Sequence, residues 1–254
     1  EQLRAIRADR DRQQEYRAAV IQQYQFLASF LQQLSDQLPR RGDRLRPQYH
    51  PLVQVCSAGK ENANGDKCIW FSGTGCRYYV LLCDGMGTGL GASQEGQTAA
   101  SLLRQMLSAG FPAEHALRSL NSLLALRGRA AAVTVDLAEI RLDSGRVTVY
   151  KWGAAPSYLV YDAMAEKIGT AGPPPGIRGS DVRAQQIRLS LRRGETLIIL
   201  SDGVDGEGVR RLAVTGQTGP LGERAAQLLE AGAESFSDDA TLALLRLRPT
   251  GMLT

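Results

Sequence analysis

The chain has 254 residues and a mass of 27.5 kDa, a length that suits one large domain or one domain with an appendage. Hydrophobic residues make up 43% and charged residues 22%, which excludes wholesale disorder and allows a core without disulfide or metal staples. The net charge of +4 is mild and diffuse, so the composition excludes a dedicated nucleic-acid binder. No apolar run reaches the ~18 residues of a transmembrane helix, so we expect no membrane segment in this chain.

The four cysteines show no C-x-x-C pair, and the two histidines lie outside zinc-ligand spacing of them. They alternate with apolar residues in strand-like runs, so we expect reduced, buried thiols and a cytoplasmic protein rather than a zinc site. The chain begins with Glu1 and shows no leader, and we expect it to be a fragment of a longer protein.

Residues 1–38 form a single helical pattern that ends at Pro39. Its apolar residues recur at helical spacing, in the order Val20, Tyr24, Leu27, Leu31, Leu34 and Leu38. This helix either packs on its own domain or serves as a linker or dimerising helix, since two heptads are too few to define a coiled coil. We therefore expect two units, a helical linker or regulatory segment at 1–46 and a domain at 47–254.

Strand patterns predominate beyond residue 49, with one helical stretch after the third strand. Strands are predicted at 52–56, 68–71, 78–83, 131–141, 146–152, 157–161, 183–189, 196–200 and 241–247. Amphipathic helices are predicted at 91–109, 113–126 and 221–231. Because regular βαβ alternation is missing, the order indicates an α+β fold with a mostly antiparallel sheet.

Aspartates stand at the ends of three apolar strand patterns. Asp84 and Asp202 end strands, and Asp238-Asp239 precede the last strand. An Asp-Gly pair is often an ordinary turn, but three such junctions in one chain favour a shared role. If the sheets bring these carboxylates together, their repulsion requires a cation, and oxygen-only ligands select Mg²⁺ or Mn²⁺. Asp66, taken alone, indicates a hairpin turn.

The glycines of residues 85–91 lead into a helix and superficially fit a dinucleotide-binding fingerprint. That interpretation requires a parallel strand after the helix, whereas a second helical pattern follows here. The glycines are better explained as letting the backbone approach a metal ion without Cβ obstruction.

Five segments, taken in order, carry a resemblance to a known family. They are Asp84–Gly89, Asn121–Arg127, Trp152–Ser157, Ser201–Val204 and Asp238–Thr241. Their order resembles that of the metal-dependent (PPM, type 2C) serine/threonine phosphatases, and within them the phosphatase domains of the stage II sporulation E proteins. The similarity covers about residues 47–249. It implies a PPM-type β-sandwich of mostly antiparallel sheets flanked by helices.

The resemblance also implies roles for individual residues at a site that holds two ions, Mn²⁺ or Mg²⁺. Asp84 would bridge both ions, and Gly85 would offer its backbone carbonyl to one of them. Asp202 and Asp238 would complete the shell of the second ion. Asp66 matches an acidic motif beside the site, and Asp239 would support the ligands or bind a weaker third ion.

The family resemblance has departures and leaves alternatives. Met86 stands where many eukaryotic relatives have a histidine that is a candidate general acid, and their phosphate-gripping arginine has no clear counterpart. The implied reaction is hydrolysis of phosphoserine on a small anti-anti-sigma-type protein, by water that two metal ions activate, in the control of a sporulation sigma factor. The chain would be the cytoplasmic part of a membrane-anchored protein. The alternatives are a catalytically silent phosphoprotein-binding module and a scaffold or homodimer that associates through its helices.

Overall fold

The computed structural model describes residues 46–60, 64–87, 89–127, 132–162, 164–177, 183–215, 220–232 and 238–251. Their strands form two five-stranded sheets, both with antiparallel pairing throughout. Sheet I has the order β1-β10-β9-β6-β7, with strands β1 (Tyr49–Ala58), β10 (Ala240–Pro249), β9 (Thr196–Leu200), β6 (Ser157–Tyr161) and β7 (Met164–Ile168). Sheet II has the order β2-β3-β4-β5-β8, with strands β2 (Asp66–Ser72), β3 (Arg77–Gly85), β4 (Val133–Arg141), β5 (Arg146–Trp152) and β8 (Gln185–Ser190).

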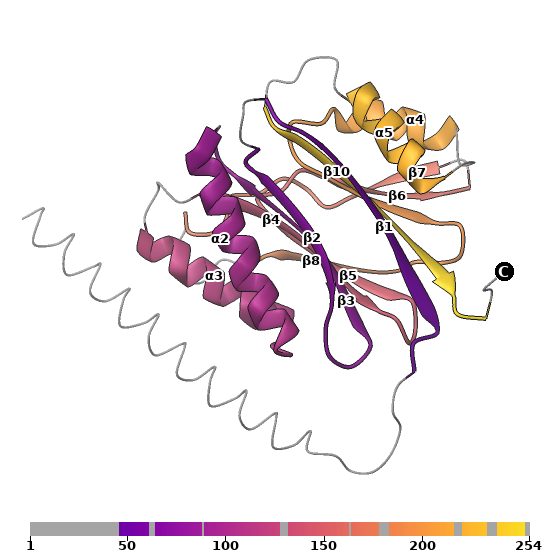
Figure 1. The fold of residues 1–254 in the computed structure, drawn as a ribbon, viewed down its shortest axis with the longest axis horizontal. Coiled ribbons are helices and arrows are strands. Elements are labelled where there is room, and N and C mark those ends of the chain that lie inside the picture. Colours follow the sequence, from indigo (N-terminus) through magenta and orange to yellow (C-terminus); the bar gives the residue numbers. More distant parts are fainter. Residues whose placement is uncertain are drawn as a thin grey trace, which may run out of the picture.

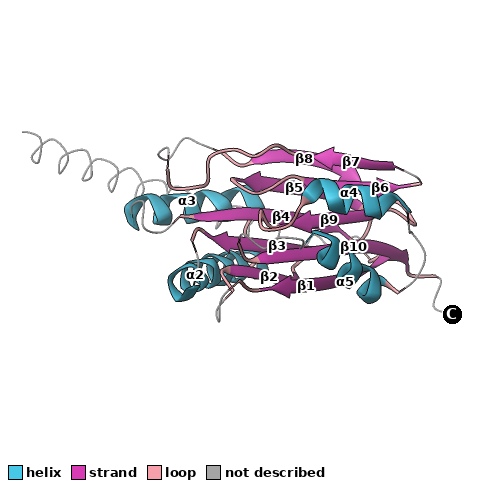
Figure 2. Cartoon of the chain, turned by 90° about the horizontal axis from the view of Figure 1, so that it is seen from above, coloured by secondary structure: helices cyan, strands magenta, loops and turns pink. Residues whose placement is uncertain are grey.

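Helices cover the outer face of each sheet. Figure 1 shows four layers, with α2 (Gly89–Ser108) and α3 (Ala113–Arg127) on one side and α4 (Gly206–Thr215) and α5 (Leu221–Gly232) on the other. The same separation of the two helix pairs is visible from above in Figure 2. Three apolar clusters fill the spaces between these layers, and the central one joins Val80 and Leu82 of sheet II to Leu197 and Leu245 of sheet I.

The prediction of an α+β fold built on mostly antiparallel sheets is confirmed. Two elements were missed: β7 is a largely exposed edge strand without clear alternation, and α4 begins with two glycines that disfavour helix. Asp205 nevertheless starts α4, because its carboxylate accepts hydrogen bonds from the N–H groups of Glu207 and Gly208, each at 3.0 Å. The helix predicted at 1–38 lies outside the described residues.

Two further sequence expectations concern the state of the cysteines and the presence of membrane-spanning helices. All four cysteines are free thiols, but of the four only Cys83 is buried, so the prediction of buried thiols is wrong for Cys56, Cys68 and Cys76. Burial nevertheless raises the pKa of Cys68 to about 12. Within the described part of the chain, no helix is long and apolar enough to cross a membrane.

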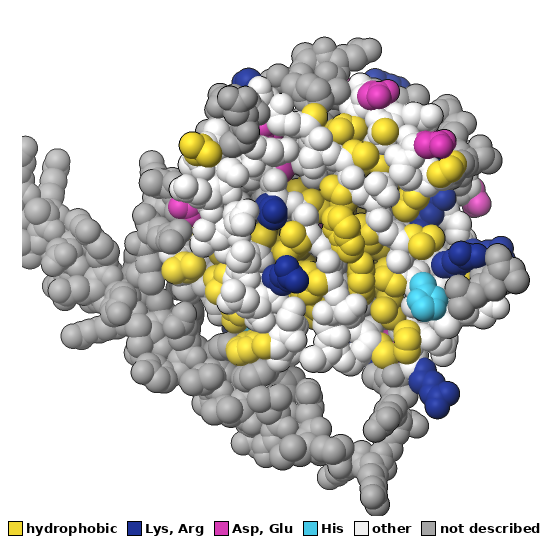
Figure 3. All heavy atoms as spheres, viewed as in Figure 1, with side chains coloured by type: hydrophobic (Ala, Val, Ile, Leu, Met, Phe, Trp, Pro, Cys, Tyr) yellow, Lys and Arg dark blue, Asp and Glu magenta, His cyan; other side chains and the backbone are white. Residues whose placement is uncertain are grey.

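The edge strands β1 and β2 lie on one side of the sandwich. A strip of apolar side chains runs down the middle of this face in Figure 3. Two large apolar side chains on these strands are exposed, Leu52 on β1 at 43% and Trp70 on β2 at 47%. The described helices thus cover the two outer sheet faces and do not cover this edge.

A buried ion pair within sheet II is linked to sheet I through a serine hydroxyl. Asp136 on β4 and Lys151 on β5 are opposite in register, and their side chains are in contact. Ser157, the first residue of β6, donates to Asp136 at 2.9 Å and accepts from Lys151 at 2.8 Å. All three residues are at most 2% exposed. Because the charges have left water, each depends on the other for compensation.

Removing only one charge of this pair should therefore be more harmful than removing both. We expect Lys151→Met to lower the free energy of unfolding by about 3–5 kcal/mol, because Asp136 would stay buried without its cation. The double variant Lys151→Met/Asp136→Leu should regain most of that loss. Denaturant unfolding of the three proteins measures both effects. Equal destabilisation of the single and double variants would contradict this account.

Candidate metal centre

Asp66 and Asp84 face each other at one end of sheet II. Asp66 is the first residue of β2, Asp84 is the penultimate residue of β3, and the two are directly opposite in register. Asp84 shares strand parity with Val80 and Leu82, so it belongs to the face that meets sheet I. The hairpin predicted at Asp66 is wrong, because β1 and β2 pair with other strands and belong to different sheets. The N–H of Asp66 instead donates to Asn64 Oδ1 at 2.7 Å, in a local turn that leads into β2. The fold adds what the turn alone does not provide, a second carboxylate beside it.

Asp202 and Asp238 come from sheet I, in the loops that follow β9 and precede β10. Hydrogen bonds between Ser201 and Thr241 hold the two loops together, from Ser201 N to Thr241 O at 2.9 Å and from Thr241 N to Ser201 Oγ at 2.8 Å. Gly203 lies so close to the backbone of Asp239 that a Cβ atom would collide with its carbonyl. The two loops are therefore held together where β9 ends and β10 begins.

Asp239 points inward and is 3% exposed. One of its oxygens accepts the N–H of Lys60 at 2.7 Å, and the other accepts the N–H of Gly65 at 2.6 Å. Both oxygens are therefore engaged in holding the chain just before β2, which favours the supporting role over that of a direct ligand. Sequence patterns identified Asp239 but gave no sign of Lys60 or Gly65, because the contact spans more than 170 residues.

The carboxylates at this end of the sandwich influence one another electrostatically. Burial, followed by the negative charges of Asp66, Asp202 and Asp238, raises the pKa of Asp84 to about 8. Burial is also the main reason that the pKa of Asp66 rises to about 6. Asp202 is exposed, yet partial burial and the charge of Asp238 raise its pKa as well. The charge of Asp239 also raises the pKa of Asp66, so all five sequence-predicted carboxylates belong to one electrostatic cluster.

The chemistry of this cluster fits a hard divalent cation. Both oxygens of Asp66 are buried and, within the described residues, have no hydrogen-bond partner of good geometry, although the hydroxyls of Ser201 and Thr241 help to lower its pKa. A cation beside them would compensate this buried charge. Among the described residues, no three His, Cys, Asp or Glu side chains are arranged closely enough to hold a metal ion. Binding would thus require these side chains to draw together.

Helix α2 begins immediately beside the carboxylates. Gly85 contacts the backbone of Ala92 so closely that a Cβ atom would overlap its carbonyl oxygen. A Cβ atom on Gly96 would lie 2.5 Å from the carbonyl oxygen of Gly65. Glycines on both sides therefore let α2 approach the ends of β2 and β3. Met86, which follows Gly85, is 56% exposed. Its thioether carries no titratable group, so no acid or base stands at this position.

The family model for stage II sporulation protein E (SpoIIE) matches residues 74–248, which is most of the chain. The chain belongs to the SpoIIE family. Its match begins within the β2–β3 turn and ends in β10, so it includes Asp84, Asp202 and Asp238 but not Asp66.

Known SpoIIE proteins and related structures agree with this assignment. The chain is 31% identical over 153 residues to stage II sporulation protein E of Priestia megaterium, with 60% of this chain and 26% of that protein covered. The PP2C phosphatase domain of SpoIIE from Bacillus subtilis, solved with a fragment of its regulatory domain, superposes with a TM-score of 0.73 at 23% identity, covering 81% of this chain and 64% of that one. RsbX, solved with magnesium, superposes with a TM-score of 0.62 at 18% identity, over 80% of this chain and 100% of that one.

These similarities define the domain type. The fold is that of a PP2C-type phosphatase domain, which confirms the PPM-type β-sandwich expected from the sequence motifs. The chain spans about a quarter of the length of the Priestia megaterium relative.

The raised pKa values predict how the stability of the metal-free protein depends on pH. A carboxyl whose pKa is higher in the folded state stabilises the fold below its unfolded pKa, and that contribution is lost as the pH rises through the folded pKa. For Asp66 and Asp84 this loss falls between about pH 4 and pH 8. We therefore expect thermal unfolding in chelator to show a lower melting temperature at pH 8.5 than at pH 5.

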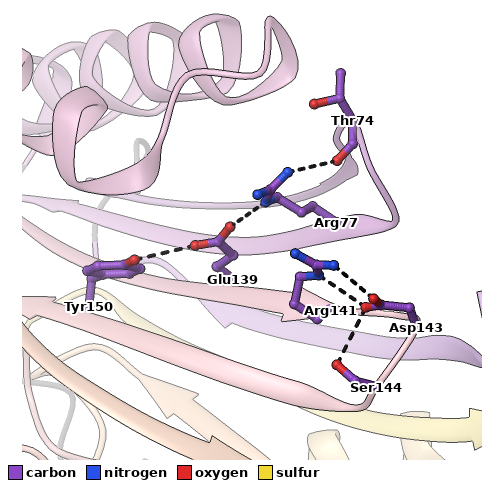
Figure 4. A network of polar contacts seen from close by, with 7 residues as sticks. All are labelled: Thr74, Arg77, Glu139, Arg141, Asp143, Ser144 and Tyr150. Atoms are coloured by element: carbon purple, nitrogen blue, oxygen red, sulfur yellow. Dashed lines mark hydrogen bonds and ion pairs between the residues drawn. The ribbon is translucent and has the colours of Figure 1, made fainter. Parts of the chain in front are cut away.

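The variant Asp84→Asn should reduce this loss and raise the stability at pH 8.5 by about 1–3 kcal/mol. Asp143 provides a control of opposite sign, because hydrogen bonds from Arg141 lower its pKa (Figure 4). Asp143→Asn should leave the slope between pH 5 and pH 8.5 unchanged. A wild-type melting temperature that increases across this range would refute the repulsive cluster.

The close approach of α2 can be tested at two glycines. We expect Gly85→Ala to lower the free energy of unfolding by about 1–3 kcal/mol, because its Cβ atom would push against the backbone of Ala92. Gly91 lies in α2 next to Ala92, and a Cβ atom there would meet no other atom within 4 Å, so Gly91→Ala should instead add about 0.5–1 kcal/mol of helix propensity. Urea unfolding midpoints compare the two, and a Gly85→Ala protein as stable as the wild type would exclude the contact.

Proposed function

We propose that this domain is a metal-dependent protein phosphatase that hydrolyses phosphoserine on a small regulatory protein of the anti-anti-sigma type. In this role it would control a sporulation sigma factor. The observation that carries the proposal is the gathering of Asp66, Asp84, Asp202 and Asp238 from both sheets, which leaves Asp84 with a pKa of about 8. Membership of the SpoIIE family supports it.

The chain's own residues have distinct tasks in this proposal. Asp84, with its central position among the other carboxylates, would bridge two ions, and the Gly85 carbonyl would serve one of them. Asp202 and Asp238 would hold the second ion, and Asp66 would lie beside the pair. Asp239 would keep the loop before β2 in place through its two backbone contacts.

Two bound ions, Mg²⁺ or Mn²⁺, would supply activation of a water molecule and neutralisation of phosphoryl charge. The protein would contribute carboxylates that draw together around the ions, and the exposed Asp202 would lie on the side from which a substrate approaches. Met86 cannot donate a proton, so the leaving serine oxygen would take its proton from solvent or from water at the site. No cysteine nucleophile is needed, and burial raises the pKa of Cys83, which adjoins Asp84, so that its thiol is unreactive.

The wider setting is also part of the proposal. Residues 47–254 would form the phosphatase domain and residues 1–46 a linker or regulatory segment, with homodimerisation through helices as one use of that segment. The chain would act on the cytoplasmic side as part of a longer, membrane-anchored protein, without binding nucleic acid.

The decisive experiment measures phosphate release from an aryl phosphate and from a phosphoserine protein, with and without millimolar Mn²⁺. We expect activity that requires Mn²⁺ and falls by at least about 100-fold in Asp84→Asn, because that variant loses the shared ligand. Asp143→Asn, which removes a carboxylate far from this cluster, serves as the matched control and should retain activity. Full turnover by Asp84→Asn at saturating Mn²⁺ would exclude the proposed mechanism.

The competing function is a catalytically silent module of the same fold that binds a phosphoprotein. The observation in its favour is that the carboxylates of the described residues are not drawn together closely enough to hold an ion. Mn²⁺ titration calorimetry separates the two functions: binding that Asp84→Asn abolishes supports the enzyme, and no binding in the wild-type protein supports the silent module.

A further inference from the structure

A small cavity lies between α3 and the outer face of sheet II, away from the carboxylate cluster. Its volume is about 110 Å³, room for about three water molecules and hence for one small oxyanion. Arg118 of α3, Trp152 of β5 and Arg183, just before β8, contribute hydrogen-bond donors to its wall. Glu114, Gln186 and Tyr150 are the other polar residues of its lining. We call it the α3–β8 cavity.

The donors of this cavity lack acceptors. Trp152 is 3% exposed, and its indole N–H has no hydrogen-bond partner among the described residues. An indole nitrogen can only donate, so burying it unpaired costs free energy that an acceptor would recover. In the described part of the chain, neither Arg118 nor Arg183 has an ion-pair partner. One buried indole N–H without an acceptor and two guanidinium groups without an ion-pair partner therefore line the same space, and Arg118 and Arg183 are partly and largely open to solvent.

A second cavity nearby shows what a compensated lining looks like. It has a volume of about 380 Å³ and lies at the elbow between α2 and α3, where Arg77, Glu139 and Tyr150 contribute to its wall. Figure 4 shows that Arg77 and Tyr150 both donate to Glu139, at 2.9 and 3.4 Å. The guanidinium charge of Arg77 in this second cavity is thus already neutralised by Glu139. The α3–β8 cavity differs because two arginines and a single carboxylate, that of Glu114, line it, and within the described residues no ion pair joins them.

We propose that the α3–β8 cavity binds a small oxyanion, with inorganic phosphate as its best-fitting form. Two guanidinium groups and an indole N–H would donate to the anion, and charge-assisted hydrogen bonds of this kind are the strong ones. The excess of one positive charge over Glu114 favours an anion over a neutral molecule. Because Arg118 belongs to α3 and Arg183 precedes β8, the bound anion would tie α3 to the edge of sheet II.

The experiment follows the indole N–H signals by ¹⁵N–¹H NMR in metal-free protein, at constant ionic strength. The sequence has two tryptophans, Trp70 and Trp152, so Trp70→Phe assigns the remaining signal to Trp152. Titration with inorganic phosphate should shift that signal, with half-saturation at roughly 1–10 mM. Acetate is titrated in parallel: a shift with phosphate alone assigns the cavity to phosphate, and a shift with acetate shows that a carboxylate also fills it.

Charge variants provide opposite expectations. Arg118→Gln and Arg183→Gln should each weaken binding by about 5- to 10-fold, whereas Glu114→Gln should strengthen it by about 2- to 3-fold. Arg193→Gln, which removes an exposed charge outside the cavity, should leave binding unchanged. Arg183 is exposed, so its variant is expected to fold even if Arg118→Gln does not.

Two outcomes would overturn the proposal. One is a Trp152 signal that stays fixed up to about 50 mM phosphate, well above the expected half-saturation, and the other is a shift that is equal in the wild type and in Arg183→Gln. Asp84→Asn should bind phosphate like the wild type, since the carboxylate cluster is not involved. Failure of this proposal and failure of the proposed phosphatase function can therefore be told apart.

Discussion

The constraint on which this structure depends is the repulsion among carboxylates gathered at one end of a two-sheet sandwich. Asp66 and Asp84 come from sheet II, and Asp202 and Asp238 come from the loops of sheet I. No local segment would hold these charges together by itself, because each group is more stable when separated from the others. The apolar core between the sheets supplies the free energy that keeps them adjacent. The site is therefore a consequence of sheet packing, and a divalent cation is the natural means of relieving its strain.

Backbone contacts at glycine hold the frame around these charges. Gly85 admits the start of α2, and Gly203 admits the backbone of Asp239, so that two loops and a helix meet where side chains would keep them apart. Asp239 then fastens the segment before β2 through the N–H groups of Lys60 and Gly65. The neighbouring residues Asp238 and Asp239 therefore have different structural roles. Asp238 acts on Asp84 through its charge, whereas Asp239 acts on Asp66 through its charge and also holds the chain before β2 in place.

Charge is balanced differently elsewhere in the fold. Asp136, Lys151 and Ser157 form a buried group in which every charge has a counterpart, and it joins the two sheets. On the outer face of sheet II, Arg77 and Tyr150 are satisfied by Glu139. Against these compensated networks, the carboxylate cluster and the α3–β8 cavity are two places in the described part of the chain where polar groups of one kind converge without partners. Uncompensated groups are costly, and they are therefore where ligands are to be expected.

The sequence by itself determined the fold class, the position of most strands and helices, and the aspartates that matter. Apolar runs that end at Asp84 and Asp202 carry that information locally, because an acid after a buried strand needs a reason. Sequence patterns missed β7 and α4, where an exposed edge strand and a glycine-rich helix start weaken the periodic signal. Only the tertiary structure decided that Asp66 faces Asp84, that both oxygens of Asp239 are engaged, and that Arg118, Trp152 and Arg183 share a cavity. These relations join residues far apart in the chain, and no spacing rule encodes them, because register and sheet packing alone bring such residues together.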